Sequence, residues 1–322
     1  MCITLLSTAH PTYPFILLSN RDEFLDRPTL SAEWWDSPNG HVLGGRDLQR
    51  QERGTWLGIT KQGRIANLTN FRDESAEVVG NKSRGGLVNA YLTAAPDFGW
   101  TDESFVKYLV DDIGIHNVGG FTLLFGELRA LRTDGSLPGL ATVSNRTSHS
   151  EDITKIGTRL LETHGLSNSH YGDRSWTKVV DGEKLLNEAI ENDIETGDSQ
   201  ESFTNKLFDL LSTDTLPRAK PGEDFQTQSR QLRNSIFIPP VGGSSIESKP
   251  ADQVAAADES TVINDGSINV GEGAYGTHQQ TVILVDIEGR VTFVERTLYD
   301  THGQPAAGDK HEKRVEFQIE GW

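Results

Sequence analysis

The chain has a single cysteine, Cys2, which directly follows Met1. Methionine aminopeptidases remove Met1 when the second residue is small, and cysteine is small enough. The mature chain would then begin with a thiol and a free α-amine on the same residue. The ordinary pKa of an α-amine is about 7.7–8, so a useful fraction is unprotonated at neutral pH. Such an amine can activate the thiol as its own base, although a lone cysteine at position 2 can also arise by chance.

The elements that must position Cys2 begin with two short apolar runs, at 3–9 and 15–19. They flank His10-Pro11-Thr12-Tyr13-Pro14, which is typical of two strands joined by a turn. A charged group, Asn20-Arg21-Asp22-Glu23, comes directly after the second run.

The same patterns predict the rest of the fold. Further strands are expected at 56–60, 65–70, 120–128, 141–143, 281–286, 291–295 and 315–319, and helices at 86–95, 104–113, 152–163, 183–194 and 202–211. Strands dominate both ends of the chain and helices its middle. This order predicts an α+β fold in which helices cover the outer faces of stacked sheets.

The composition excludes several classes of protein. Thirty Lys and Arg against 47 Asp and Glu give a net charge of −17, which repels phosphate backbones, so we expect no nucleic-acid partner. A mean hydropathy of −0.46, without a run of about 18 apolar residues, predicts no transmembrane segment. One cysteine leaves no intramolecular disulfide, and no Cys/His cluster has metal-ligand spacing, so we expect neither metal nor cofactor. The first residues do not resemble a secretory signal, so we expect a cytoplasmic protein.

We interpret residues 1–322 as one domain that carries a flexible insertion. Residues 241–273 are rich in small and acidic residues. Such a stretch buries too little apolar surface to offset the entropy lost on ordering, so we expect it to be disordered. Residues 195–202 and 302–310 are shorter stretches of the same kind.

Several motifs occur in a specific order along the chain. They are Met1-Cys2-Ile3, Asn20-Arg21-Asp22-Glu23-Phe24 with Arg27-Pro28, Gly54-Thr55-Trp56-Leu57-Gly58-Ile59, Leu68-Thr69-Asn70-Phe71, Ser83-Arg84-Gly85, Gly165-Leu166-Ser167-Asn168, and Tyr275-Gly276-Thr277 before Val282-Ile283-Leu284-Val285-Asp286. The series resembles the transport and Golgi organization protein 2 family, also called the NRDE family. The resemblance spans nearly the whole chain except the insertion.

The resemblance implies a relation to the N-terminal nucleophile hydrolases, whose fold is a four-layer αββα sandwich. Within that group it is most similar to the choloylglycine hydrolases and penicillin V acylases. Carried over residue by residue, it implies that the site consists of Cys2, Arg21, either Asp22 or Glu23, Asn70 and Asn168. His278 stands where those acylases and many family members have an arginine, which puts a positive charge late in the pocket in doubt.

The chemistry gives each of these residues a role. The Arg21 guanidinium would favour the Cys2 thiolate, and a carboxylate would orient the α-ammonium. An Asn70 amide could donate to the oxyanion of a tetrahedral intermediate, an interaction worth roughly 3–4 kcal/mol. The alternatives are a structural ion pair that closes a turn and asparagines that satisfy backbone groups at strand ends.

Two functions follow from the resemblance. The first is a cysteine amidohydrolase or acyl hydrolase acting on a small, acylated, non-peptide molecule. The alternative is a non-catalytic factor that binds a lipid-like or hydrophobic ligand in trafficking. The family's name implies a role in Golgi organization and protein secretion, so a Golgi-associated or mitochondrial location stands beside the cytoplasmic one. The sequence does not indicate an oligomeric state.

Overall fold

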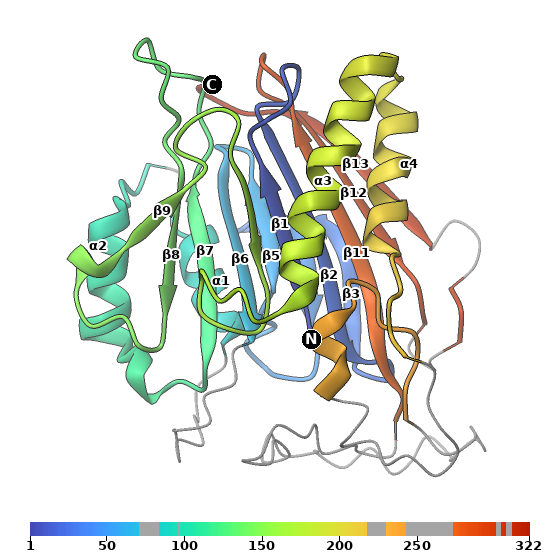
Figure 1. Ribbon diagram of the computed structural model, residues 1–322. Helices are drawn as coiled ribbons and strands as arrows, with labels where there is room; N and C mark the ends of the chain where they lie inside the picture. The colour runs from blue at the N-terminus through green and yellow to red at the C-terminus, as the bar shows by residue number, and fades with distance from the viewer. Residues whose placement is uncertain (71–83, 96, 218–229, 243–272, 301–303, 307–310) are drawn as a thin grey trace.

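The computed structural model describes residues 1–70, 84–95, 97–217, 230–242, 273–300, 304–306 and 311–322. Within these residues the protein is a mixed helix and sheet structure with two antiparallel sheets (Figure 1). The α+β class predicted from the order of strands and helices is therefore confirmed.

Cys2 directly precedes β1, an inner strand of the first sheet. The strand order of this sheet is β10-β1-β2-β11-β12-β13. Its strands are β1 (Ile3–Ser7), β2 (Phe15–Phe24), β10 (Thr163–Leu166), β11 (Tyr275–Val285), β12 (Arg290–Thr297) and β13 (Glu312–Gln318). The β2 strand extends beyond the apolar run at 15–19, so the charged group Arg21-Asp22-Glu23 lies inside the strand and pairs with β11.

The second sheet has the order β3-β4-β5-β6-β7-β8-β9. Its strands are β3 (Thr29–Trp34), β4 (Val42–Asp47), β5 (Leu57–Thr60), β6 (Arg64–Asn70), β7 (Phe121–Glu127), β8 (Leu140–Ser144) and β9 (Thr154–Ile156). The strands expected at 56–60, 65–70, 120–128 and 141–143 are all present. The sequence patterns did not predict β3 and β4. The β3 strand shows no clean apolar alternation because it is a partly exposed edge strand with an irregular register.

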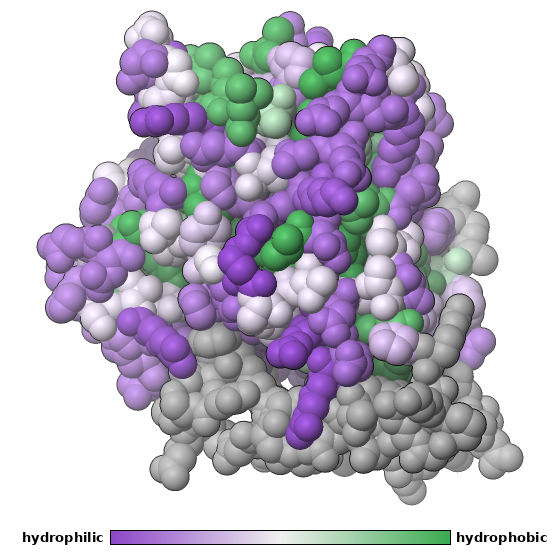
Figure 2. All heavy atoms as spheres, in the orientation of Figure 1, coloured by the Kyte–Doolittle hydropathy of each residue, from purple (hydrophilic) through white to green (hydrophobic). Residues whose placement is uncertain are grey.

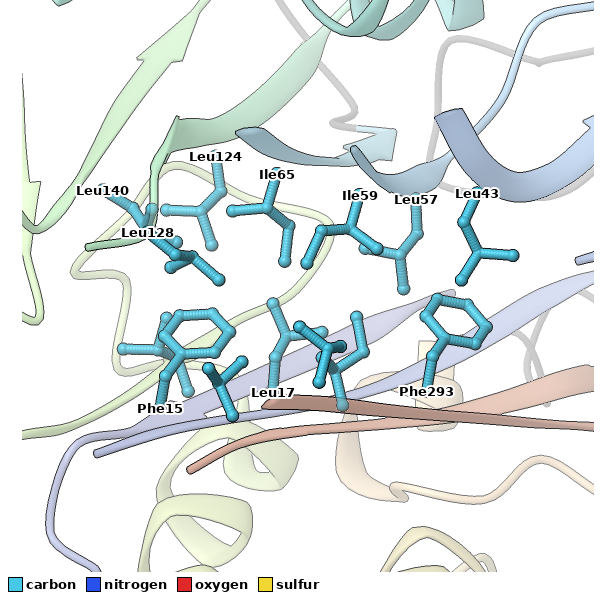
Figure 3. Packing of buried hydrophobic residues seen from close by; sticks show 14 of the residues in the cluster. Phe15, Leu17, Leu43, Leu57, Ile59, Ile65, Leu124, Leu128, Leu140 and Phe293 are labelled. Carbon is cyan, nitrogen blue, oxygen red and sulfur yellow. The ribbon is translucent and has the colours of Figure 1, made fainter. Parts of the chain in front are cut away.

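Apolar side chains fill the space between the sheets. Phe15, Leu17 and Phe293 of the first sheet face leucines and isoleucines of the second (Figure 3). A second cluster packs the other face of the second sheet against α1 (Gly85–Leu92) and α2 (Asp102–Lys107), which continues as a π-helix over Tyr108–Ile113. A third packs the first sheet against α3 (Thr177–Thr196) and α4 (Gln200–Leu211). The outer side of α3 and α4 is mostly hydrophilic (Figure 2), as expected for amphipathic helices.

Two sequence-based predictions are wrong. Residues 152–163 do not form a helix: β9 and the start of β10 lie there, and Gly157 and Leu161 adopt positive φ angles that no α-helix contains. Residues 195–202 are not a flexible stretch. Gly197 ends α3 in the left-handed conformation, and the Ser199 side chain accepts a hydrogen bond from the Ser202 amide at the start of α4.

The insertion at 241–273 lies outside the described residues except at its ends, and so does most of 302–310. Val241 and Tyr275 form an isolated antiparallel bridge next to the gap. Among the helices of the described residues, none is long and apolar enough to cross a membrane.

Candidate active site

Cys2 lies at one end of the space between the two sheets. The Thr4 hydroxyl donates to Asn67 Oδ1 on the second sheet over 2.7 Å, so Thr4 faces that sheet. Side chains alternate along a strand, which places Cys2 on the same face as Thr4. Ile3 pairs with Asn20, so Cys2 lies beside Arg21 when this register is continued. The Cys2 thiol is 3.8 Å from the main-chain oxygen of Asp22.

Arg21 faces the second sheet, like Cys2. Its guanidinium lies 4.4 Å from the centroid of the Trp56 ring, directly before β5, and is almost completely buried. Glu23 is on the same face, with Oε2 3.9 Å from Arg21 Nη2 and 3.8 Å from Arg27 Nε. Glu23 therefore belongs to a network of charged side chains with Arg21 and Arg27, and it does not pair with the N-terminal amine.

Asp22 points to the opposite face of the sheet, toward α3. One carboxylate oxygen accepts a hydrogen bond from the Thr277 hydroxyl over 2.7 Å, and the other lies 3.3 Å from the α-ammonium of Met1. The Tyr275 hydroxyl contacts the same ammonium and donates to the main-chain oxygen of Asp22. Of the two acids that the sequence left open, Asp22 is the one at the N-terminal amine.

Lys178 on α3 is a site residue that the sequence patterns did not predict. Its side chain is fully buried, and its ammonium lies 3.8 Å from Asp22 Oδ2 and donates to the main-chain oxygen of Met1. Burial lowers the pKa of Lys178, while the negative charge of Asp22 opposes that change. The sequence pattern placed the start of this helix near residue 183, six residues late. A fully buried lysine is rare without such partners.

The pKa of the Cys2 thiol differs in direction from the sequence-based expectation. Burial raises it, and this effect is larger than the opposing effects of the N-terminal ammonium and of Arg21. Desolvation penalises the thiolate more than one guanidinium at this place favours it. With Met1 in place, the thiol is therefore less acidic than a free cysteine. Burial also lowers the pKa of the Met1 ammonium, although Asp22 acts in the opposite sense.

The structure brings Asn70 and Asn168 together close to Cys2. The Asn168 amide donates to the main-chain oxygen of Asn70. The neighbouring Ser167 hydroxyl donates to the main-chain oxygen of Cys2 over 2.6 Å, and the Thr69 hydroxyl donates to that of Ser167. The contacts of the described residues do not join either asparagine side chain to the Cys2 thiol.

Three further buried polar residues, Glu295, His278 and Gln279, lie near this end of the molecule. Their spacing in the sequence does not mark them as a group. Glu295 on β12 accepts a hydrogen bond from the Ala32 amide over 2.7 Å, and burial raises its pKa to about 7. His278 occupies an irregularity between β11 and β2, and burial, together with the charge of Arg21, lowers its pKa to about 4. Gln279 pairs with Arg21 across the strands. His278 is therefore neutral at pH 7 and does not supply a positive charge.

A small apolar cavity lies far from these groups, near Leu6, Leu128 and Trp322. Its volume of about 20 Å³ is room for about one water molecule, so it is no substrate pocket. Among the described residues, no three His, Cys, Asp or Glu side chains gather in a way that could hold a metal ion.

Comparisons with known proteins identify relatives over nearly the full length. The family model described as "Transport and Golgi organisation 2" matches residues 1–300. An uncharacterized protein of Saccharomyces cerevisiae is 30% identical, covering 99% of this chain and 100% of its own. The Bos taurus protein named "Transport and Golgi organization protein 2 homolog" is also 30% identical, covering 94% of both chains.

Solved structures with a partial likeness include an N-acylethanolamine-hydrolyzing acid amidase ortholog of Caenorhabditis elegans. It is 12% identical with a TM-score of 0.39, covering 73% of this chain and 98% of its own. A conjugated bile acid hydrolase of Clostridium perfringens is 9% identical with a TM-score of 0.38, covering 99% and 98%.

Proposed function

This chain belongs to the Transport and Golgi organisation 2 family, and we propose that it is a cysteine amidohydrolase or acyl hydrolase with an N-terminal nucleophile. The substrate is a small, acylated, non-peptide molecule. We propose that the four layers form an αββα sandwich. Three apolar clusters support this order: one lies between the helices α3 and α4 and the first sheet, one between the two sheets, and one between the second sheet and the helices α1 and α2. The name of the relatives supports a role in Golgi organization, and with it a cytoplasmic or Golgi-associated location.

One observation carries the proposal. A buried carboxylate and a buried ammonium converge on the main chain of Met1, next to the chain's only thiol: Asp22 lies at the α-ammonium, and Lys178 donates to the carbonyl oxygen. Burying charge is costly even in pairs, so two desolvated side-chain charges at the start of the chain favour a role beyond packing. Removal of Met1 turns the Cys2 nitrogen into an amine beside these two groups.

The reaction then follows from ordinary acid and base chemistry. The Cys2 amine takes the thiol proton, and the thiolate attacks the carbonyl carbon of the substrate. The resulting ammonium returns a proton to the leaving amine or alcohol, and a water molecule hydrolyses the thioester. Asp22 orients the ammonium form, while the positive charge of Lys178 lowers the pKa of the amine and keeps a larger fraction of it unprotonated. Arg21, on the thiol's face of the sheet, favours the thiolate.

Asn70 and Asn168 are proposed to hold the oxyanion, because their segments adjoin the main chain of Cys2. We expect Asn70→Ala to lower hydrolysis about a hundredfold or more.

The test uses the full chain with its native start, after intact mass shows that Met1 is absent. Hydrolysis of a panel of N-acyl amides with a fluorescent leaving amine is compared between variants. Cys2→Ala should abolish hydrolysis. Lys178→Met should lower it about tenfold or more and move the acidic limb of the pH profile to higher pH, because the amine loses a like charge that lowered its pKa. Lys184→Met, on the exposed side of the same helix, should change neither.

Two outcomes contradict the proposal. The first is hydrolysis that survives in Cys2→Ala. The second is a Met1-free protein whose Cys2 reacts with alkylating reagents but which hydrolyses no member of the panel. The second outcome favours the non-catalytic factor that binds a hydrophobic ligand.

A further inference from the structure

Unpartnered polar atoms gather on the two strands that follow β1 in the first sheet, at Arg21 of β2 and at His278 and Gln279 of β11. Thirteen buried side-chain nitrogen and oxygen atoms of the described residues have no hydrogen-bond partner, and five of them belong to Arg21, His278 and Gln279. Burial and Arg21 lower the pKa of His278, and the nearby Gln279 side chain opposes them, but the contact between Gln279 and the ring lacks hydrogen-bond geometry. Buried polar groups in native proteins are nearly always paired, so an unpaired group of this size points to a bound molecule.

These residues form a row that leads away from the thiol. Arg21 lies next to Cys2 on β2, and Gln279 on β11 pairs with Arg21. Gln279 in turn pairs with Thr297 of β12, whose hydroxyl lies 3.2 Å from that of Ser31 on the second sheet. The row therefore faces the space between the sheets, as Cys2 does.

The charges in the row nearly cancel. Arg21 carries the positive charge, and the Glu23 carboxylate lies 3.9 Å away. Glu295 faces the same space, and Arg21 acts on its pKa. His278 is neutral at pH 7 because of its burial. The row thus offers unpaired donors, on Arg21 and Gln279, and unpaired acceptors, on Gln279 and His278, without a net positive charge.

We propose that Arg21, His278 and Gln279 form a subsite that binds a neutral carboxamide group next to the Cys2 thiol. The amide oxygen accepts from Arg21 and Gln279, and the amide N–H donates to Gln279 or His278. A carboxylate offers no donor for the unpaired acceptors and meets the negative charge of Glu23. The inference rests on the proposed function and deepens it, because it assigns an uncharged amide, separate from the carbonyl that the thiolate attacks, as a substrate group held beside the thiol.

Two alkylating reagents of nearly equal size test this subsite directly. Iodoacetamide carries a neutral amide and iodoacetate a carboxylate, and Cys2 is the only cysteine that either can modify. The rate of Cys2 alkylation by iodoacetamide is divided by the rate of its alkylation by iodoacetate, both measured by intact mass at pH 7.5. This ratio is compared with the same ratio for free cysteine. We expect a ratio three to ten times higher for the protein, as one or two hydrogen bonds allow.

A matched pair of variants separates the subsite from general effects. Gln279→Leu should return the ratio toward that of free cysteine. Gln280→Leu removes an equally buried amide from the same strand, but this amide points to the opposite face, toward Ser212, and the ratio should stay high. Circular dichroism checks that both variants fold. If Gln279→Leu does not fold, Gln279→Met takes its place: it keeps the size of the side chain but removes the amide donor, and it should also lower the ratio.

The outcomes distinguish the subsite from the proposed hydrolysis. A wild-type ratio equal to that of free cysteine, or one that Gln279→Leu leaves unchanged, overturns the subsite even if the protein hydrolyses amides. A raised ratio that Gln279→Leu abolishes supports the subsite even if no hydrolysis is found, because alkylation needs only the thiol.

Discussion

Adjacent charged residues of β2 serve different faces of the first sheet. Arg21 faces the second sheet with Cys2, whereas Asp22 faces α3 with Lys178. One strand thus supplies the group beside the thiol and the group beside the amine, because side chains alternate along it. A shift of one residue in the register of β2 would exchange the two environments, so the pairing of β2 with β11 determines the chemistry of the site.

Glu295 gives a prediction for pH dependence. Burial raises its pKa from 4.5 to about 7, while the Ala32 hydrogen bond and Arg21 oppose the rise. The folded protein then holds this proton more tightly than the unfolded chain, so the associated stability is complete below pH 4.5 and is lost as the pH rises through 7. We expect the unfolding free energy of wild type to fall by about 2 kcal/mol relative to Glu295→Gln between pH 5 and 8.

Urea unfolding at both pH values measures this difference. Glu191→Gln, at an exposed position of α3, is the control. Its unfolding free energy should differ from that of wild type by the same amount at pH 5 and at pH 8. An equal response of Glu295→Gln and wild type to pH would mean that the Glu295 carboxyl is ionised at pH 5 in the folded protein.

At the scale of elements, the segment before β5 fixes the place of the Trp56 ring under Arg21. This segment also packs directly on the start of α1: a Cβ atom at Gly54 would lie 2.8 Å from Gly85 Cα and 2.9 Å from Gly85 C. These are main-chain atoms, so no side-chain rotation can relieve the contact.

We therefore expect Gly54→Ala to lower the unfolding free energy by about 1–3 kcal/mol. Gly86 lies in α1 beside Gly85, and a Cβ atom there would have no atom within 4 Å. Gly86→Ala should therefore leave the unfolding free energy unchanged or raise it by up to about 1 kcal/mol. Chemical denaturation of both variants checks the contrast. Equal stabilities would show that α1 can move away from the sheet at little cost.

The sequence predicted most elements of the sheets but only part of the site. The apolar runs of β1, β2, β11 and β12 are long and regular, so their periodicity was sufficient. The apolar spacing of residues 152–163 also fits a helix, but pairing with β8 and β1 outweighs this local preference. Lys178, Glu295 and Gln279 carry no local signal, because only the pairing of distant strands and the docking of α3 bring them to Cys2.

At the scale of the whole molecule, the space between the sheets is apolar at one end and polar at the other. Leucines, isoleucines and phenylalanines fill the first part (Figure 3), and Cys2, Arg21, Gln279 and Glu295 face the second. The apolar part supplies the stability that allows several buried charges to persist near the thiol, since their burial alone is unfavourable.

The insertion gives a prediction at this scale. Val241 and Tyr275 exchange two main-chain hydrogen bonds, of 2.8 and 2.9 Å, so the two ends of the intervening segment lie side by side. We expect replacement of residues 245–270 by a short Gly/Ser linker to leave the melting temperature within a few degrees, because loop entropy changes slowly with length. Differential scanning calorimetry measures this, and a large fall would show that the segment contributes packing of its own.

The enclosed Met1 ammonium has a practical consequence for the production of this protein. A fusion tag joined to Met1 converts the ammonium to an amide, which forms no ion pair with Asp22. The tag also prevents the removal of Met1 on which the proposed Cys2 amine depends. Trp322 lies at the opposite end of the molecule (Figure 1), where an added tag does not touch these groups. Imaging or purification with an amino-terminal fusion would thus report on an altered protein, whereas a carboxy-terminal fusion preserves the native arrangement.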